Sequence, residues 1–168
     1  MKKKFAIIAG EPNSVNSEII AKSWKKININ IKKKIFIIWN YYLIKKQFST
    51  LKIRIPINKI NKVEDLVNTH ALQILNVPIK FKNPFKVEKK INSKYLKNCL
   101  ILGHNLSINK KILGFINCPI DKKKTFKSAN TGVTEFLAKK SKLNNTEVMM
   151  IYNNKLSVVP ITTHINLK

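Results

Sequence analysis

Lys4-Phe-Ala-Ile-Ile-Ala9 is followed at once by the turn-forming residues Gly10-Glu-Pro-Asn-Ser14. A short apolar run that ends at glycine and proline indicates a buried β-strand. Similar runs occur at Ile35–Trp39 and at Ile112–Asn117, with helical patterns between them. Because strands that are apolar along their whole length are buried on both faces, the three runs predict a mostly parallel sheet with flanking helices.

Helices are expected between and after these strands, over residues 17–26, 40–48, 94–105 and 134–142. Either Asn16 or Ser17 is predicted to cap the first helix, because both side chains can accept a hydrogen bond from a backbone N–H group. Its apolar face is expected to consist of Ile19, Ile20 and Trp24. In the last helix, Phe136 and Leu137 are expected to face inward.

Two further strands are predicted near the carboxyl end, over Glu147–Tyr152 and Leu156–Ile161. Asn153-Asn154 lies between them, and two residues that tolerate positive φ are typical of a tight antiparallel hairpin. Residues 58–94 contain prolines and Lys/Asn-rich joins and are interpreted as irregular. The predicted fold class is therefore α/β, with a mostly parallel sheet and an antiparallel hairpin.

The formal net charge of +25 is extreme for a chain of this length. Nucleic-acid binding is one hypothesis, since a basic surface attracts phosphate backbones. Compositional drift is the alternative, because Lys, Ile and Asn have AT-rich codons and dominate the whole chain. Arg54 is the only arginine, whereas nucleic-acid readers favour the bidentate guanidinium group. Nucleic acid is therefore not the expected partner.

The sequence also bears on the compartment. Its apolar runs all fall short of the roughly 18–20 residues that a membrane span needs. The apolar part of the amino terminus covers about six residues, fewer than the roughly 7–15 of a signal peptide. We expect a cytoplasmic protein with no membrane partner. Cys99 and Cys118 lie in apolar contexts and are expected to be buried free thiols.

Candidate ligand residues follow the last apolar run. Val158-Val-Pro-Ile161 is interpreted as a buried strand that delivers Thr162, Thr163 and His164 at its carboxyl end. Strand ends of this kind place polar groups at ligand crevices in α/β proteins. A neutral imidazole is also the commonest metal ligand, although a single histidine after a strand can equally be structural.

Thr134 follows Gly132 at the start of a predicted helix. It is either the helix cap or a hydrogen-bonding group for an anionic substrate at the helix N-terminus, and the residues themselves leave both interpretations open. The first strand is followed by Gly10-Glu-Pro-Asn-Ser-Val-Asn16 rather than by GxGxxG. A Rossmann pyrophosphate loop is therefore not supported.

Taken together, four stretches resemble, in order, the amino-terminal portion of the 4-hydroxythreonine-4-phosphate dehydrogenase family of vitamin B6 synthesis. They are Ile7-Ile-Ala-Gly-Glu-Pro12 with Glu18-Ile-Ile20, Gly114-Phe-Ile-Asn-Cys-Pro-Ile-Asp-Lys122, Gly132-Val-Thr-Glu-Phe-Leu-Ala138 and Thr162-Thr-His-Ile-Asn-Leu167. Residues 40–95 match only loosely. The resemblance implies an isocitrate/isopropylmalate-dehydrogenase-like α/β/α fold, with residues 1–168 as a single incomplete unit of a two-lobed enzyme.

The resemblance also implies a function. Family members oxidise the phosphorylated amino acid 4-phosphooxy-threonine with NAD, and the product then loses carbon dioxide. They are homodimers that hold a divalent metal (zinc, magnesium or cobalt) through three histidines. On this basis His164 is the expected metal ligand and Thr134 the expected substrate-binding residue. The catalytic and NAD-binding residues are not assigned.

Two departures from the family pattern are visible. Val133 stands in the place of a substrate-binding histidine, and Asn13-Ser-Val-Asn-Ser17 replaces a glycine-rich segment. The family also continues for about as many residues again, with the other two metal histidines. We expect the chain by itself to be inactive, with an exposed apolar seam where the rest would pack. A non-catalytic degenerate paralogue or binding module is the alternative.

Overall fold

The computed structural model describes residues 4–126, 132–143 and 147–160. The chain forms two compact units, Met1–Ala129 and Asn130–Lys168, and each is described here by itself. Within the described ranges, none of the helices has the length and apolarity that crossing a membrane requires.

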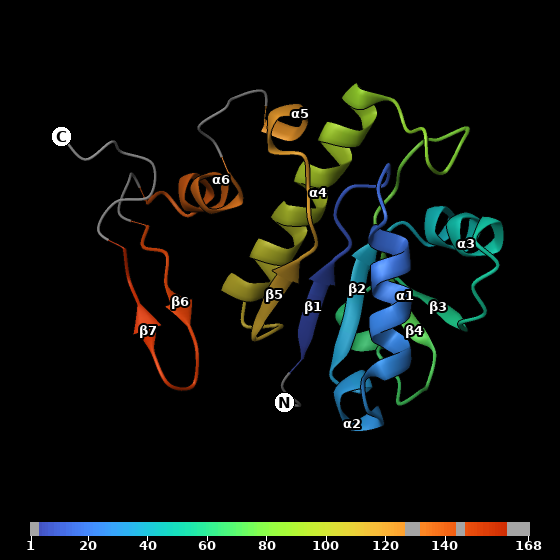
Figure 1. The fold of residues 1–168 in the computed structure, drawn as a ribbon, viewed down its shortest axis with the longest axis horizontal. Helices are drawn as coiled ribbons and strands as arrows, with labels where there is room; N and C mark the ends of the chain where they lie inside the picture. The colour runs from blue at the N-terminus through green and yellow to red at the C-terminus, as the bar shows by residue number, and fades with distance from the viewer. Residues whose placement is uncertain (1–3, 127–131, 144–146, 161–168) are drawn as a thin grey trace. The chain divides into compact units, whose positions relative to one another are not determined.

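In its described part, the first unit is built on a five-stranded parallel sheet (Figure 1). The strands are β1 (Phe5–Ile8), β2 (Ile35–Trp39), β3 (Ile57–Ile60), β4 (Leu72–Asn76) and β5 (Gly114–Asn117). Their order across the sheet is β3-β4-β2-β1-β5, and every neighbouring pair is parallel. The chain thus moves away from β1 in one direction through β2, β3 and β4, and returns to the other side of β1 for β5.

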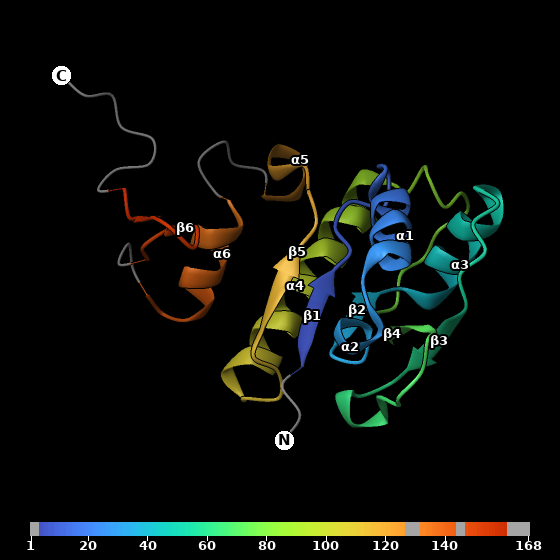
Figure 2. The same cartoon turned by 60° about the horizontal axis from the view of Figure 1, so that its bottom comes forward.

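Helices connect these strands. They are α1 (Asn16–Lys26), α2 (Ile29–Lys32), α3 (Tyr41–Thr50), a 3-10 turn (Val63–Asp65), α4 (Lys89–Ile108) and α5 (Lys122–Phe126). Figures 1 and 2 place α1 on one face of the sheet and the long helix α4 on the opposite face. Helices on both faces of a parallel sheet define the α/β class, so the predicted fold class is confirmed.

The core lies around the central strand β2. Phe36, Ile37 and Ile38 are each fully buried, because successive side chains point to opposite faces and both faces of this strand are covered. On the α4 side, a Cβ atom on Gly103 would lie 3.0 Å from Ile8 Cδ1 and 3.3 Å from Phe115 Cδ1. The absence of a side chain at Gly103 therefore lets α4 pack closely on β1 and β5.

The expectations for the first helix are partly wrong. The N-cap position is Val15, and both Asn16 and Ser17 lie inside α1 and are buried. The Asn16 side chain instead donates a 2.9 Å hydrogen bond to the Pro119 carbonyl, so it joins two loops rather than capping a helix. Ile20 and Trp24 are buried as expected, but Ile19 is 43% exposed.

Strands β3 and β4 were not expected within residues 58–94, which were interpreted as irregular. β3 is an edge strand whose Asn58 and Lys59 are exposed, so its sequence lacks a continuous apolar run. β4 is buried but contains Gln73, whose side-chain amide exchanges two 2.9 Å hydrogen bonds with the backbone of Val67. A buried polar residue satisfied in this way interrupts the hydrophobic pattern without interrupting the strand.

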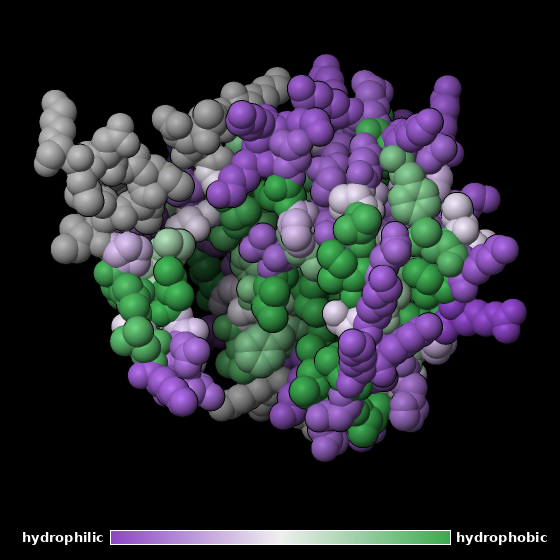
Figure 3. Space-filling view, viewed as in Figure 1, coloured by the Kyte–Doolittle hydropathy of each residue, from purple (hydrophilic) through white to green (hydrophobic). Residues whose placement is uncertain are grey.

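β5 was expected to be buried, and this is wrong for one of its faces. Its register with β1 pairs Phe5 with Gly114 and Ile7 with Ile116, which places all four residues on the face opposite α4. Ile116 is 61% exposed and Phe5 is 39% exposed. Within the first unit, and apart from the two neighbouring residues, no described atom lies within 4 Å of a Cβ built on Gly114. We call these four residues the open sheet face; apolar residues gather in this part of the view in Figure 3.

We expect Ile116→Glu to weaken self-association of the chain while changing the free energy of unfolding by less than about 0.5 kcal/mol, because the side chain is already exposed. Sedimentation velocity over a range of protein concentrations measures the first effect, and urea denaturation measures the second. Val67→Glu is the control, since Val67 is 56% exposed and lies away from the open sheet face. Equal weakening by both variants would mean that added negative charge, and not this face, controls association.

The described part of the second unit contains α6 (Val133–Lys140), β6 (Ile151–Tyr152) and β7 (Ser157–Val158). β6 and β7 pair antiparallel, as predicted. Asn153 and Leu156 exchange backbone hydrogen bonds of 2.8 and 3.2 Å, so the two-residue turn is Asn154-Lys155, one position later than expected. The strands are not buried: in the run interpreted as a buried strand, Val158 is 44% and Val159 is 52% exposed.

Candidate functional site

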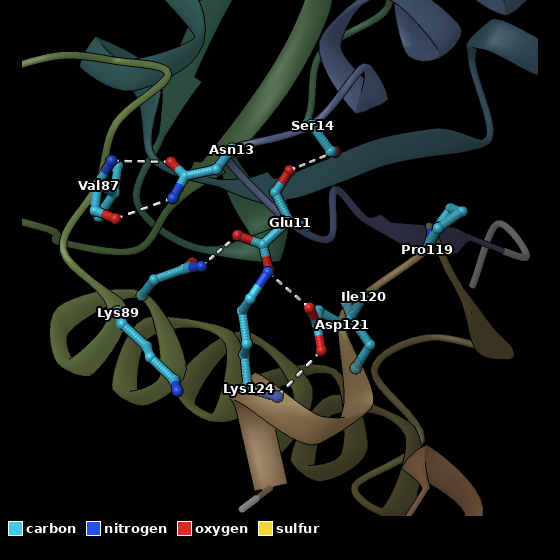
Figure 4. Close-up of a pocket in the computed structure, with 10 residues that line it drawn as sticks. Glu11, Asn13, Ser14, Val87, Lys89, Pro119, Ile120, Asp121 and Lys124 are labelled. Atoms are coloured by element: carbon cyan, nitrogen blue, oxygen red, sulfur yellow. Dashed lines mark hydrogen bonds and ion pairs between the residues drawn. The ribbon is translucent and has the colours of Figure 1, made fainter.

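A cavity of about 440 Å³ opens in the first unit at the carboxyl ends of β1 and β5 (Figure 4). Three segments line it: the loop between β1 and α1, the first turn of α4, and the segment from β5 into α5. The chain after β1 leads into α1 on one face of the sheet. The chain after β5 leads into α5, which packs against α4 on the other. Neighbouring parallel strands whose connections part in this way form a topological switch point, where α/β proteins bind ligands.

The loop after β1 is held in a defined conformation. Gly10 has a φ of +75°, and a Cβ atom there would lie 2.6 Å from both Asn16 Nδ2 and the Pro119 carbonyl oxygen. Glycine is therefore required for both its backbone conformation and the close approach of the segment after β5. Asn13 fixes the loop from the other side, because its amide donates to and accepts from the Val87 backbone at 2.8 Å each.

The inner wall of the cavity holds two oxygen atoms that accept hydrogen bonds. Glu11 Oε1 accepts a hydrogen bond from Asn92 Nδ2, which orients both side chains. Glu11 Oε2 and Asn92 Oδ1 are also buried, and neither has a hydrogen-bond partner among the described residues. Asn92 is only 4% exposed, so its free oxygen cannot turn to bulk solvent. A buried acceptor without a partner is costly, and these two atoms mark a place for a donor.

Asp121 and Lys124 form the opposite wall. Lys124 Nζ lies 2.8 Å from Asp121 Oδ2, and the Lys124 backbone N–H donates to Asp121 Oδ1 at 3.0 Å. This hydrogen-bonded pairing lowers the pKa of the Asp121 carboxyl, and it raises the pKa of the Lys124 ammonium group. Figure 4 shows the Lys124 side chain running from α5 toward both Asp121 and Glu11. This wall therefore carries an ion pair.

The two cysteines offer no nucleophile at neutral pH. Burial raises the pKa of the Cys99 thiol to about 12, and the expectation of a buried free thiol is confirmed there. Burial also raises the pKa of Cys118, which is only partly buried. The thiolate is the reactive form, so neither group is primed for covalent catalysis.

The sequence-predicted site residues lie in the second unit. Thr134 is the second residue of α6 and is exposed, and Val133 precedes it. The interpretation of Thr134 as the helix cap is wrong, because the cap position is Gly132, whose N–H donates to Glu135 Oε2 at 2.6 Å. His164 lies outside the described residues. The structure therefore does not test the ligand roles of Thr134 and His164.

None of the residues that line the cavity was predicted as a site residue from the sequence. Glu11 and Asp121 fall within two of the four stretches that carry the family resemblance, directly after β1 and β5. Asn92 and Val87 gave no signal, because they lie in the region interpreted as irregular. The α4 helix begins at Lys89, five residues earlier than expected, and this earlier start places Asn92 in its first turn.

The fold and the cavity define an α/β protein with a ligand crevice at a sheet switch point. A family model described as pyridoxal phosphate biosynthetic protein PdxA matches residues 31–168. The chain belongs to this family. It is 33% identical to a 4-hydroxythreonine-4-phosphate dehydrogenase of Aquifex aeolicus, over 100% of this chain and 52% of that protein. A protein of the same name from Sulfurihydrogenibium is 29% identical, over 98% of this chain and 51% of that protein.

Solved structures agree in fold. A 4-hydroxythreonine-4-phosphate dehydrogenase from Burkholderia phymatum superposes with a TM-score of 0.83 at 18% identity, covering 98% of this chain and 51% of that one. One from Klebsiella pneumoniae gives a TM-score of 0.81 at 23% identity, covering 99% and 52%. At such identities the likeness establishes the fold. The chain thus spans about half the length of the relatives it matches.

Proposed function

We propose that residues 1–168 supply the first half of a cytoplasmic, homodimeric 4-hydroxythreonine-4-phosphate dehydrogenase, and that this half is inactive by itself. The activity would be NAD-dependent oxidation of 4-phosphooxy-threonine, followed by decarboxylation. The whole chain would act as one incomplete unit of a two-lobed enzyme. The proposal rests on family membership combined with coverage of only about half of each relative.

The open sheet face supports the idea of a missing half. Parallel sheets are almost always covered on both faces. Phe5, Ile7, Gly114 and Ile116 lie on a face that the described residues of the first unit leave uncovered over β1 and β5. An apolar surface of this kind favours association with further polypeptide. The remaining half of the family sequence is a natural candidate for the layer that covers it.

The family resemblance assigns one metal-binding residue and one substrate-binding residue. His164 would contribute one metal ligand and Thr134 would contact the substrate; a bound divalent metal would polarise the substrate's hydroxyl group. Among the described residues, however, no three His, Cys, Asp or Glu side chains come together as metal ligands. The described residues by themselves therefore do not fit the metal.

A complementation experiment tests the proposal. Residues 1–168 are mixed or co-expressed with the carboxyl-terminal half of the Aquifex aeolicus relative, which this chain does not cover. NADH formation is then followed with 4-phosphooxy-threonine, NAD and added zinc. The chain alone is expected to give no NADH, and the complemented chain to give measurable turnover. Ile116→Glu is expected to prevent complementation, whereas the exposed-site control Val67→Glu is not.

Either of two results would contradict the proposal. Turnover by residues 1–168 alone would show that the second half is dispensable. A stable complex without turnover would point to the non-catalytic alternative, which the loss of a hydrogen-bonding side chain at Val133 favours. Val133→His in that complex then separates the two cases: regained substrate binding means a single lost contact, and continued absence means that the pocket itself has changed.

A further inference from the structure

We propose that the cavity between β1 and β5 is a subsite for the primary ammonium group of an amino acid ligand, with Glu11 Oε2 and Asn92 Oδ1 as its acceptors. The choice of an amino acid rests on the proposed function. The acceptor chemistry rests on the geometry of the cavity.

The two acceptors are placed for one donor group. Glu11 Oε1 is already engaged by the Asn92 amide, so the two side chains are held together with their remaining oxygens unused by described residues. An ammonium group has three N–H donors and no acceptor, which matches a carboxylate oxygen beside an amide oxygen. Hydrogen bonds between charged groups are also stronger than neutral ones.

The chemistry of this wall argues against an anion. A phosphate or carboxylate would bring further acceptors against Glu11 Oε2 and Asn92 Oδ1, with no donor between them. Lys124, whose side chain is directed toward Glu11, already pairs with Asp121 at 2.8 Å. A metal ion is disfavoured for a different reason, since the described residues bring no three metal-ligating side chains together.

The outer part of the cavity suits the other end of an amino acid. α4 begins at Lys89, and its N-cap residue Glu88 forms no capping hydrogen bond with its side chain among the described residues. Free N–H groups at a helix N-terminus favour a carboxylate. Lys89 lies three residues before Asn92, hence on the same side of the helix, and lines the cavity with its ammonium directed away from Glu11 (Figure 4). An amino acid can therefore lie with its ammonium inward and its carboxylate toward Lys89.

Removal of the Lys124 ammonium changes ligand affinity in opposite directions for a cationic and an anionic ligand. The Lys124 side chain is directed toward Glu11 (Figure 4). The hydrogen bond to Asp121 is the main cause of the raised pKa of Lys124, and the Glu11 carboxylate makes a smaller contribution. If the cavity takes an ammonium group, Lys124 competes with the ligand for Glu11, and its removal strengthens binding. If the cavity takes an anion, Lys124 attracts the ligand, and its removal weakens binding.

The experiment uses the full chain, 15N-labelled, and two probes: L-threonine, and 3-hydroxybutyrate, which lacks the ammonium group. Amide shifts of the loop after β1 and the first turn of α4 report binding. We expect L-threonine to bind and 3-hydroxybutyrate to bind at least about tenfold more weakly, because charged hydrogen bonds are lost. Glu11→Gln is expected to weaken threonine binding by about tenfold, and Lys124→Met to strengthen it by about threefold.

Glu64→Gln is the matched control, because Glu64 is an exposed carboxylate that pairs with Lys111 far from the cavity, and its loss removes the same charge. It is expected to leave threonine binding unchanged. Urea denaturation checks that each variant is folded; Lys124→Met changes an exposed side chain and is the safeguard if Glu11→Gln does not fold.

Three outcomes would overturn the proposal: equal binding of both probes, weaker threonine binding in Lys124→Met, or no binding of threonine at all. The last would mean that water alone occupies the two acceptors. The dehydrogenase proposal fails separately, because it is measured as turnover of the complemented protein. Binding through Glu11 without turnover rejects only the dehydrogenase, and turnover without Glu11-dependent binding rejects only the subsite.

Discussion

Gly10→Ala is expected to destabilise the first unit by about 3 kcal/mol or more, a large part of the stability of an ordinary domain. Two costs add. The φ of +75° at Gly10 places an alanine in the left-handed region, which costs about 1–2 kcal/mol. The new methyl group would also lie 2.6 Å from the Pro119 carbonyl oxygen and 2.6 Å from Asn16 Nδ2, so the hydrogen bond between these two groups must give way.

Urea denaturation measures this effect, with Trp24 and Trp39 as buried fluorescent probes. Gly114→Ala is the matched control, because it is the same substitution on the neighbouring strand, at a position where a Cβ meets no described atom within 4 Å. The control is expected to change the free energy of unfolding by less than about 1 kcal/mol. Equal losses at both positions would mean that the loop after β1 rearranges freely, and that the wall of the cavity is not fixed by Gly10.

The central strands of the sheet could be predicted from the sequence because burial on both faces leaves only apolar residues. β2 was found at its observed bounds for this reason. β1 was found at almost its observed bounds because its run is apolar throughout, although Phe5 and Ile7 lie on the open sheet face. β4 was missed although it is equally buried, because Gln73 occupies one of its core positions. The hydrogen bonds that make this glutamine acceptable go to Val67, and such a pairing across a loop leaves no mark in the sequence.

The sequence was less informative about which apolar residues are covered. Ile116 in β5 and Val158 in β7 belong to apolar runs that are typical of buried strands, but both side chains are exposed. An apolar side chain indicates that a residue is suited to a buried contact. It does not indicate whether the covering surface belongs to the same stretch of chain or to further polypeptide. An exposed apolar seam was expected from the family resemblance, and we propose that the open sheet face is part of it.

The candidate cavity also combines features that are visible in the sequence with features that depend on tertiary packing. Glu11 and Asp121 were not predicted as site residues, although each lies in the loop that follows a predicted parallel strand, where ligand crevices form. The position of Asn92 beside them could not be predicted, because it depends on where α4 starts and on how the loop before α4 packs. One buried side chain, Gln47 of α3, holds this loop and the loop after β1. Its amide donates to the Pro84 carbonyl at 2.7 Å and to the Pro12 carbonyl at 2.8 Å.

Gln47→Leu is therefore expected to destabilise the first unit by about 2–5 kcal/mol, since it leaves two buried carbonyl groups without donors at about 1–3 kcal/mol each. Gln47 is fully buried, so water cannot easily replace its amide. The loss should be visible in urea denaturation as a lower midpoint with an unchanged slope. Lys46→Leu is the control, because it introduces the same side chain at the next, exposed position of α3, and it should change the free energy of unfolding by less than about 0.5 kcal/mol.

Gln47→Glu separates loss of the hydrogen bonds from loss of packing, because the shape is kept and the donor is replaced by a carboxylate. An ionised carboxylate facing two carbonyl oxygens is unfavourable, so burial raises the pKa of the new carboxyl in the folded state. A raised carboxyl pKa means that the variant gains stability, relative to the unmodified chain, as pH falls through that value. A Gln47→Glu variant as stable as the unmodified chain at neutral pH would show that the loops after β1 and before α4 do not depend on these two hydrogen bonds. The position of Asn92 beside Glu11 would then need another cause.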